Sequence, residues 1–262
     1  MERMTLNALT TQDTYHSPSQ PIPWLARRYP PLVFYAKIAV IIYKASRVAK
    51  KGLYTNEHWI KSSIDTVKAL ESVGGRFEFH NLAVLRQLES PCVFVGNHMS
   101  ILETFVLPCL VRPYRDVTFV IKESLISYPF FRHVMRSRNP IVVGRANPRE
   151  DLKTVLVEGQ NRLNDNISVV IFPQTTRSVS FDPAKFNSLG VKLAGRGRVP
   201  VVPVALKTDA WGIGRRLKDI GEIQPDKTVH ICFGDPLPVQ GSGKKEHKII
   251  SDFIANKLDE WR

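Results

Sequence analysis

The 262-residue chain is poor in cysteine, with only Cys92, Cys109 and Cys232, and each of the three lies in an apolar run. A disulfide framework needs more cysteines, and a cysteine-based metal site needs them in closely spaced pairs. We therefore interpret all three as reduced core residues and expect no disulfide and no metal site.

Long apolar runs are also missing. The polar residues 1–20 contain no apolar segment of the kind that forms the centre of a signal peptide. The longest apolar stretch, Leu32 to Tyr43, is interrupted by Lys37 and is shorter than the roughly 20 residues that cross a bilayer. We expect neither a secretory leader nor a membrane-spanning helix.

Acidic residues are outnumbered, since 24 Asp and Glu face 37 Lys and Arg, for a formal charge of +13. Such an excess indicates an anionic partner, which can be nucleic acid, anionic lipid or a phosphorylated substrate. The sequence has no nucleic-acid-binding motif and no regular alternation of aromatic and basic residues. We therefore expect an anionic membrane surface or a phosphorylated molecule, and no nucleic acid.

The N-terminal part divides into two segments. Residues 1–30 are polar and then rich in proline, which predicts a flexible tail. Residues 31–73 predict two helices, and in the first of them four basic residues fall within roughly 80° on the helical wheel: Lys37, Lys44, Arg47 and Lys51. A broad apolar surface with one basic stripe is typical of a helix in a membrane interface, although a helix packed on the core with a solvated basic face fits as well.

Residues 74–262 predict one α/β domain. Apolar runs typical of strands alternate with helical patterns, which favours a largely parallel central sheet flanked by helices. The strands are expected at 77–79, 92–95, 117–121, 141–143, 169–172, 201–206 and 229–233. The helices between and after them are expected at 101–110, 128–136, 148–163, 187–194 and 249–261.

A histidine and a glutamate follow the apolar run 92–95. His98 stands just before a helix that Ser100 can cap, and Glu103 lies three residues after Ser100, as in a capping box. From the first turn Glu103 can point back toward the imidazole and orient it, which leaves the second ring nitrogen free to accept a proton from a hydroxyl. Equally, Glu103 could act only as a cap and His98 as an ordinary strand-end histidine.

Basic side chains follow three other predicted strands, namely Lys122, Arg145 and Arg177. Because the carboxyl ends of parallel strands meet at one edge, these residues can converge on His98. Arginine suits phosphate through two parallel charged hydrogen bonds. Hydroxyl groups accompany Arg177, and they come from Thr175, Thr176 and Ser178.

Four blocks in this order resemble the glycerolipid acyltransferase family, and most of all its 1-acylglycerol-3-phosphate acyltransferase branch. Asn97-His98 followed by Glu103 resembles the histidine–four residues–aspartate signature, and 139–145 resembles the second block, with Lys122 leading into it. The third and fourth blocks correspond to 172–178 and 199–204. The resemblance spans roughly residues 75–235.

This resemblance implies a peripheral or monotopic membrane enzyme of the cytoplasmic face. It would move a fatty acyl chain from an acyl thioester, acyl-CoA or acyl-carrier protein, to a hydroxyl of a lysophospholipid or glycerol phosphate in phospholipid biosynthesis, with no other cofactor. His98 would be the general base, and Glu103 would orient it. Lys122, Arg145 and the 175–178 segment would bind the acceptor phosphate, and Pro203 would shape the wall of the site.

Two departures from the family pattern bear on the substrate. Glu103 replaces the usual aspartate, which keeps the charge and adds one methylene, and Gln174-Thr175 replaces Glu-Gly, which removes a carboxylate. The acceptor head group is therefore left open. The alternatives are a lipid or thioester hydrolase on the same fold, which lacks support from a Gly-x-Ser-x-Gly elbow, and a non-catalytic protein that binds anionic lipid.

Overall fold

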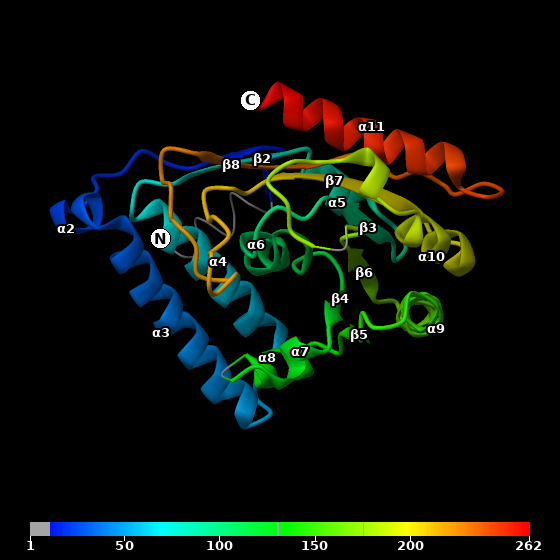
Figure 1. Cartoon of the computed structure of the whole chain (residues 1–262), viewed down its shortest axis with the longest axis horizontal. Helices are drawn as coiled ribbons and strands as arrows, with labels where there is room; N and C mark the ends of the chain where they lie inside the picture. Colours follow the sequence, from blue (N-terminus) through cyan, green and yellow to red (C-terminus); the bar gives the residue numbers. More distant parts are fainter. Residues whose placement is uncertain (1–10, 130, 175) are drawn as a thin grey trace.

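The structure is a computed structural model that describes residues 11–129, 131–174 and 176–262. Its centre is one eight-stranded sheet in the order β1-β2-β8-β7-β3-β6-β4-β5 (Figure 1). The strands are β1 (Tyr15–His16), β2 (Arg76–His80), β3 (Val93–Gly96), β4 (Val117–Lys122), β5 (Ile141–Val143), β6 (Ser168–Ile171), β7 (Val201–Lys207) and β8 (Thr228–Phe233). All neighbouring pairs are parallel except β1–β2 and β7–β8, so the predicted largely parallel sheet is confirmed.

Helices lie on both faces of this sheet. They are α2 (Trp24–Arg28), α3 (Pro30–Lys50), α4 (Asn56–Glu71), α5 (Ala83–Gln87), α6 (Leu102–Val111), α7 (Ser124–Ser127), α8 (Arg132–Ser137), α9 (Pro148–Asn164), α10 (Leu189–Gly197) and α11 (Lys244–Glu260), with a 3-10 turn at Pro183–Lys185. Figure 1 shows α11 above the sheet and α3, α4 and α6 below it. The predicted mixed architecture of a central sheet flanked by helices is therefore present.

Alternating side chains of the strands build two hydrophobic cores. On β2, Phe77 and Phe79 are fully buried in the core that α3, α4 and α6 complete. On β3, Val93 and Val95 face the second core, beneath α9, α10 and α11. This alternation follows from the two-residue repeat of a strand and fixes which residues face each layer.

The N-terminal region corrects one expectation. Within the predicted tail 1–30, β1 pairs antiparallel with β2, and α2 begins at Trp24; residues 1–10 lie outside the described part of the chain. β1 is held in place because Tyr15 and Ser17 donate hydrogen bonds to the buried carboxylate of Glu71, over 2.7 and 2.6 Å.

The two helices predicted within 31–73 are α3 and α4. They pack against each other, and α4 also packs on α6, so Phe34, Ile38, Ile64 and Leu70 belong to the same core as the sheet. None of the helices in the described residues combines the length and the apolarity needed to cross a membrane.

The direction of the strands decides where a site can form. β3, β6, β4, β5 and β7 run parallel, so the residues that follow them share one edge of the sheet. β8 runs antiparallel to β7, and β2 runs parallel to β8, so both end at the opposite edge. Ligands of such sheets bind at the carboxyl ends of the strands, which directs attention to the loops after β3 and β6.

Candidate active site

The turn after β3 is fastened to its neighbour β7 by the side chain of Asn97. The Asn97 amide donates to the carbonyl of Leu206 over 2.7 Å and accepts from the Leu206 N–H over 2.9 Å. These two bonds extend the ladder between β3 and β7 by one side chain. The backbone therefore leaves the sheet at His98 in a fixed direction.

Glu103, in the first turn of α6, is completely buried, and its carboxylate binds the turn that precedes the helix. Its Oε1 accepts from the backbone N–H groups of Met99 over 2.6 Å and Ser100 over 2.8 Å. The Ser100 hydroxyl accepts from the Leu102 N–H over 3.0 Å. The structure places the N-cap of α6 at Ile101 and not at the predicted Ser100, so the N–H groups that Glu103 binds belong to the turn before the helix. These contacts turn the carboxylate back toward the preceding chain.

The side chains of His98 and Glu103 are in contact. The Nδ1 atom of His98 lies 2.9 Å from Oε2 of Glu103. Thr208, just after β7, donates to Oε1 of Glu103 over 2.8 Å and accepts from Ser100 over 3.0 Å. An ionised carboxylate can only accept hydrogen bonds, so beside an ionised Glu103 a neutral imidazole carries its proton on Nδ1 and keeps the lone pair on Nε2.

The loop after β6 holds His98 from its other sides. The ring of Phe172 stacks on the imidazole with the centroids 4.6 Å apart and the planes 6° from parallel. The buried side chain of Gln174 accepts from the His98 N–H over 2.6 Å, and the Ser178 N–H donates to the His98 carbonyl over 2.9 Å. The imidazole keeps 17% of its side-chain surface exposed, so it is both fixed and accessible.

The Gln174 contact explains how the chain accommodates one departure from the family pattern. Only an oxygen is needed to accept the His98 N–H, and glutamine and glutamate both carry one. The local geometry at His98 is therefore compatible with either residue, while the negative charge is absent here.

The predicted cationic residues share the edge of the sheet with His98 but differ in their surroundings. Arg177 follows β6, directly beside β3, and its Nη2 donates to Asp219 over 2.6 Å. Lys122 ends β4 and is exposed. Arg145 follows β5, three strands from β3, which corresponds to about 14 Å at the usual strand spacing.

The turn that carries Arg145 is held by a helix. Arg145 has a left-handed backbone with φ of 63°, and Oδ2 of Asp151 accepts its N–H over 2.9 Å. The other oxygen of Asp151 accepts the Gly144 N–H over 3.0 Å. A carboxylate in the first turn of α9 thus presents Arg145 at the edge of the sheet, with the side chain exposed.

Of the three hydroxyl-bearing residues predicted beside Arg177, the structure describes Thr176 and Ser178. Thr175 lies outside the described residues. Thr176 is exposed, and the Ser178 hydroxyl lies 3.3 Å from that of Ser180. The structure thus places Thr176 and Ser178 beside Arg177, while the binding roles assigned to all of these residues stay predictions.

Three contributors were not singled out as site residues from the sequence. Thr208 follows β7 as His98 follows β3, so its position after an apolar strand was the available signal. Phe172 lies inside the third block, and only the fold shows that it stacks on the imidazole. Asp219 comes from the loop between β7 and β8, and no local pattern connects it to Arg177.

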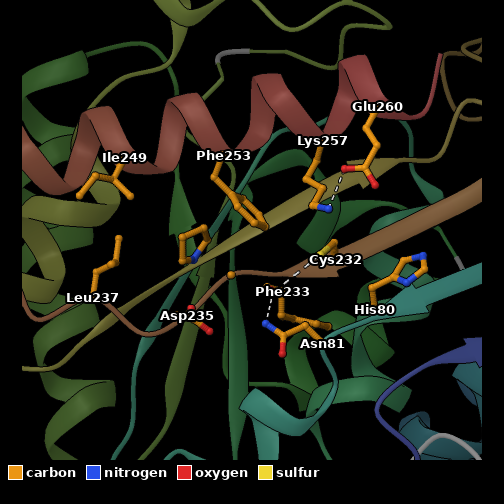
Figure 2. A pocket seen from close by; sticks show the side chains of 12 residues that line it. His80, Asn81, Cys232, Phe233, Asp235, Leu237, Ile249, Phe253, Lys257 and Glu260 are labelled. Atoms are coloured by element: carbon orange, nitrogen blue, oxygen red, sulfur yellow. Dashed lines mark hydrogen bonds and ion pairs between the residues drawn. The ribbon is translucent and has the colours of Figure 1, made fainter.

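A cavity of about 440 Å³ lies elsewhere, between α11 and the sheet (Figure 2). Ile249, Phe253 and Lys257 point into it from α11. Pro203 lines this cavity as well, which corrects the expectation that Pro203 shapes the wall of the His98 site. The cause is the strand register, because Pro203 lies in the middle of β7, opposite Val95, and not at the end of the strand.

The chain is similar in sequence to known acyltransferases. A family described as Acyltransferase matches residues 76–207. The chain is 27% identical to the 1-acyl-sn-glycerol-3-phosphate acyltransferase of Pseudomonas aeruginosa over 72% of this chain and 69% of that protein. It is 33% identical to the human 1-acyl-sn-glycerol-3-phosphate acyltransferase beta over 50% of this chain and 46% of that protein. The match to the relative from Cocos nucifera covers 36% of that protein.

A solved structure shows the same fold. The crystal structure of the 1-acyl-sn-glycerophosphate (LPA) acyltransferase PlsC from Thermotoga maritima matches with a TM-score of 0.65 and 18% sequence identity. The match covers 90% of this chain and 96% of that one. At this identity the likeness establishes the arrangement of the elements and no more.

Proposed function

Since the chain belongs to the acyltransferase family, we propose that it transfers a fatty acyl group from an acyl thioester to a hydroxyl of a lysophospholipid or glycerol phosphate. The donor would be acyl-CoA or an acyl-carrier protein. The observation that carries the proposal is the 2.9 Å contact between His98 and the buried Glu103 at the carboxyl edge of the sheet.

The proposed reaction needs no acyl-enzyme. Nε2 of His98 takes the proton of the acceptor hydroxyl as its oxygen attacks the thioester carbonyl, and Glu103 stabilises the imidazolium that forms. Backbone N–H groups or Lys122 stabilise the oxyanion. When the carbon–sulfur bond breaks, the leaving thiolate takes the proton back from His98, so the enzyme returns to its starting state.

The acceptor phosphate would bind along the row of cationic residues. Arg177 is nearest to His98 by strand order, with Lys122 and Arg145 on the strands beyond. In the free enzyme Asp219 occupies one donor of the Arg177 guanidinium. A phosphate that binds two donors of this planar group would compete with Asp219 for it.

We also propose that α2 and α3 bind an anionic membrane surface. Several of their large apolar side chains are exposed, namely Trp24, Leu25, Leu32, Val40 and Tyr43. Basic side chains lie beside them on the exposed surface, namely Arg27, Arg28, Lys37, Lys44, Arg47 and Lys51. Apolar groups that enter the acyl–headgroup boundary and cations that meet lipid phosphates are the two attractions that hold an interfacial helix.

The decisive experiment supplies purified protein in vesicles with both donor types and a panel of lysolipids and glycerol phosphate, and identifies the products by mass. We expect one acylated product for each acceptor consumed. Release of free fatty acid without consumption of acceptor would instead identify a hydrolase.

His98→Ala is the matching variant, and we expect its transfer rate to fall by roughly 10²–10⁴-fold, the usual contribution of a general base. His133→Ala, which removes an imidazole from α8, is the control and should keep the parent rate. A His98→Ala protein that transfers acyl chains as fast as the parent would refute the proposed mechanism.

A further inference from the structure

Three strands far apart in the sequence bring histidines and a glutamate together on the α11 side of the sheet. Phe77 and Phe79 of β2 face the opposite core, so Glu78 and His80 face this side. The register places His16 of β1 and His230 of β8 directly beside Glu78. The four side chains therefore share one face, about 5 Å apart from strand to strand.

The donor atoms of this cluster lie close to one another. Oε2 of Glu78 is 3.4 Å from Nδ1 of His230 and 3.8 Å from Nε2 of His80, and the donor atoms of all three residues lie within 4.8 Å of one another. Nδ1 of His16 is 4.0 Å from the other oxygen of Glu78. Ligands about 2.1 Å from a tetrahedral zinc ion are separated by about 3.4 Å, so small side-chain movements suffice.

His230 supplies a second, independent observation. Its Nδ1 is buried and makes no hydrogen bond to any of the described residues, although the Glu78 carboxylate is near. A buried nitrogen without a partner is costly, and a metal ion is one partner that such a nitrogen can take. The ring is also fixed in place, since Trp261 stacks on it with the centroids 5.0 Å apart.

The surrounding charges permit a cation here. Lys207 of β7 lies opposite His230, and its ammonium group is paired with Asp209 over 3.3 Å. Lys257 of α11 is paired with Glu260 over 2.7 Å (Figure 2). His80 lies at the same end of the α11 cavity as this pair, with about a third of its side-chain surface exposed, which gives an ion a path to the cluster.

We propose that Glu78, His80 and His230 bind a divalent transition-metal ion of the zinc type, with His16 or water as the fourth ligand. Imidazole nitrogens with one carboxylate oxygen are a donor set that such ions select. Bound there, the ion would connect β2 with β8, and also with β1 where His16 is the fourth ligand. In the sheet order β8 and β2 lie two and three strands from β3, so the expected role of the ion is to stabilise the fold and not to take part in acyl transfer.

The test uses tag-free, chelator-stripped full-length protein. Titration with Zn²⁺ by calorimetry should show one site per chain with a micromolar or lower Kd, and the melting temperature should rise. Co²⁺ should give the intense visible absorption of a four-coordinate ion with nitrogen and oxygen ligands. His80→Ala should weaken binding by at least about 100-fold, because even the outer partners of metal ligands contribute 10–100-fold.

Control variants separate a built site from scattered surface histidines. His133→Ala should leave binding unchanged, and His16→Ala should weaken it less than His80→Ala does. The metal-free melting temperature of each variant shows whether it folds, and Glu78→Gln offers a second ligand variant that preserves shape. The inference fails if the parent binds no zinc at micromolar concentration, or if His80→Ala and Glu78→Gln both bind as the parent does.

Discussion

Glu103 divides its two carboxylate oxygens between two tasks. One oxygen accepts from two backbone N–H groups and Thr208 and so holds the start of α6, while the other meets the imidazole of His98. The sequence presented Glu103 either as part of a helix cap at Ser100 or as the group that orients His98. The N-cap position is instead Ile101, without a side-chain cap, and Glu103 holds the two residues before it while it contacts His98.

We expect Glu103→Gln to lower kcat by roughly 10²–10⁴-fold, with little change in fold. The amide oxygen can keep the helix-start bonds, but the NH₂ group then faces Nδ1 of His98 and favours the tautomer with the proton on Nε2. Steady-state kinetics and circular dichroism measure the two effects. Glu103→Asp, which retains the charge, should lose less activity, and a Glu103→Gln enzyme with the parent kcat would contradict the assigned role.

Gln174 yields a stability prediction. Gln174→Leu removes the acceptor of the buried His98 N–H, and we expect the free energy of unfolding in urea to fall by about 1–3 kcal/mol. Gln174→Glu keeps an acceptor oxygen and should lose less. Equal losses in both variants would mean that packing, and not this hydrogen bond, is what Gln174 contributes.

At the scale of elements, the sequence pattern predicted most of the strands. All seven predicted strands are present within one or two residues of their expected ends, and the helix predicted at 148–163 is α9. β1, α2, α5 and α7 were missed because a strand of two residues or a helix of four or five shows no complete period of hydrophobicity. β1 is held instead by Glu71, a partner more than 50 residues away.

Glu71, at the end of α4, gives a prediction with a defined pH dependence. Burial raises the pKa of this carboxyl above 4.5, in spite of the hydrogen bonds from Ser17 and Tyr15. Its contribution to stability is therefore complete below pH 4.5 and is lost as the pH rises through the folded pKa. We expect Glu71→Gln, which stays neutral and keeps an acceptor, to exceed the parent in stability at pH 7 and to match it near pH 4.

Glu57, at the start of the same helix, provides the opposite control. A hydrogen bond from Thr55 lowers the pKa of Glu57 below 4.5, so its contribution is present above pH 4.5 and is lost on acidification. Glu57→Gln should therefore not be more stable than the parent at pH 7. Urea unfolding between pH 4 and 8 checks both variants, and a pH-independent effect of Glu71→Gln would contradict the assignment.

For α3, the exposed apolar side chains make the membrane proposal testable. We expect Leu32→Ser with Val40→Ser to weaken sedimentation with anionic vesicles at least about tenfold, because a fully buried side chain of this size contributes about 1.5–3 kcal/mol. Val157→Ser, an equivalent exposed change on α9, should leave binding unchanged. If both variants lose vesicle binding equally, α3 is not part of the membrane-binding surface.

At the scale of the whole molecule, the charge of +13 predicts a salt-dependent attachment. Binding to vesicles rich in anionic lipid should exceed binding to neutral vesicles and fall steeply between about 0.1 and 1 M salt, as the screening length shortens from about 10 to 3 Å. Flotation at a series of salt concentrations measures this. Binding that is indifferent to lipid charge would leave the apolar side chains as the sole attraction.

The site itself was predictable only in part, and the reason is distance along the chain. His98 and Glu103 lie five residues apart, so local rules could bring them into contact. Asp219 reaches Arg177 from 42 residues away. The cluster of Glu78, His80 and His230, with His16 beside it, spans most of the sequence. Such neighbours are set by strand order and register, which no short motif encodes.

The antiparallel pair β7–β8 divides the sheet into two parts, β3-β6-β4-β5 on the side of β7 and β2-β1 on the side of β8. Loops grown or exchanged after β3 and β6 belong to the first part and leave the histidines of β1, β2 and β8 untouched. Altering which head group is acylated and altering how firmly the outer strands hold together are therefore separate engineering problems, and changes of the two kinds should add.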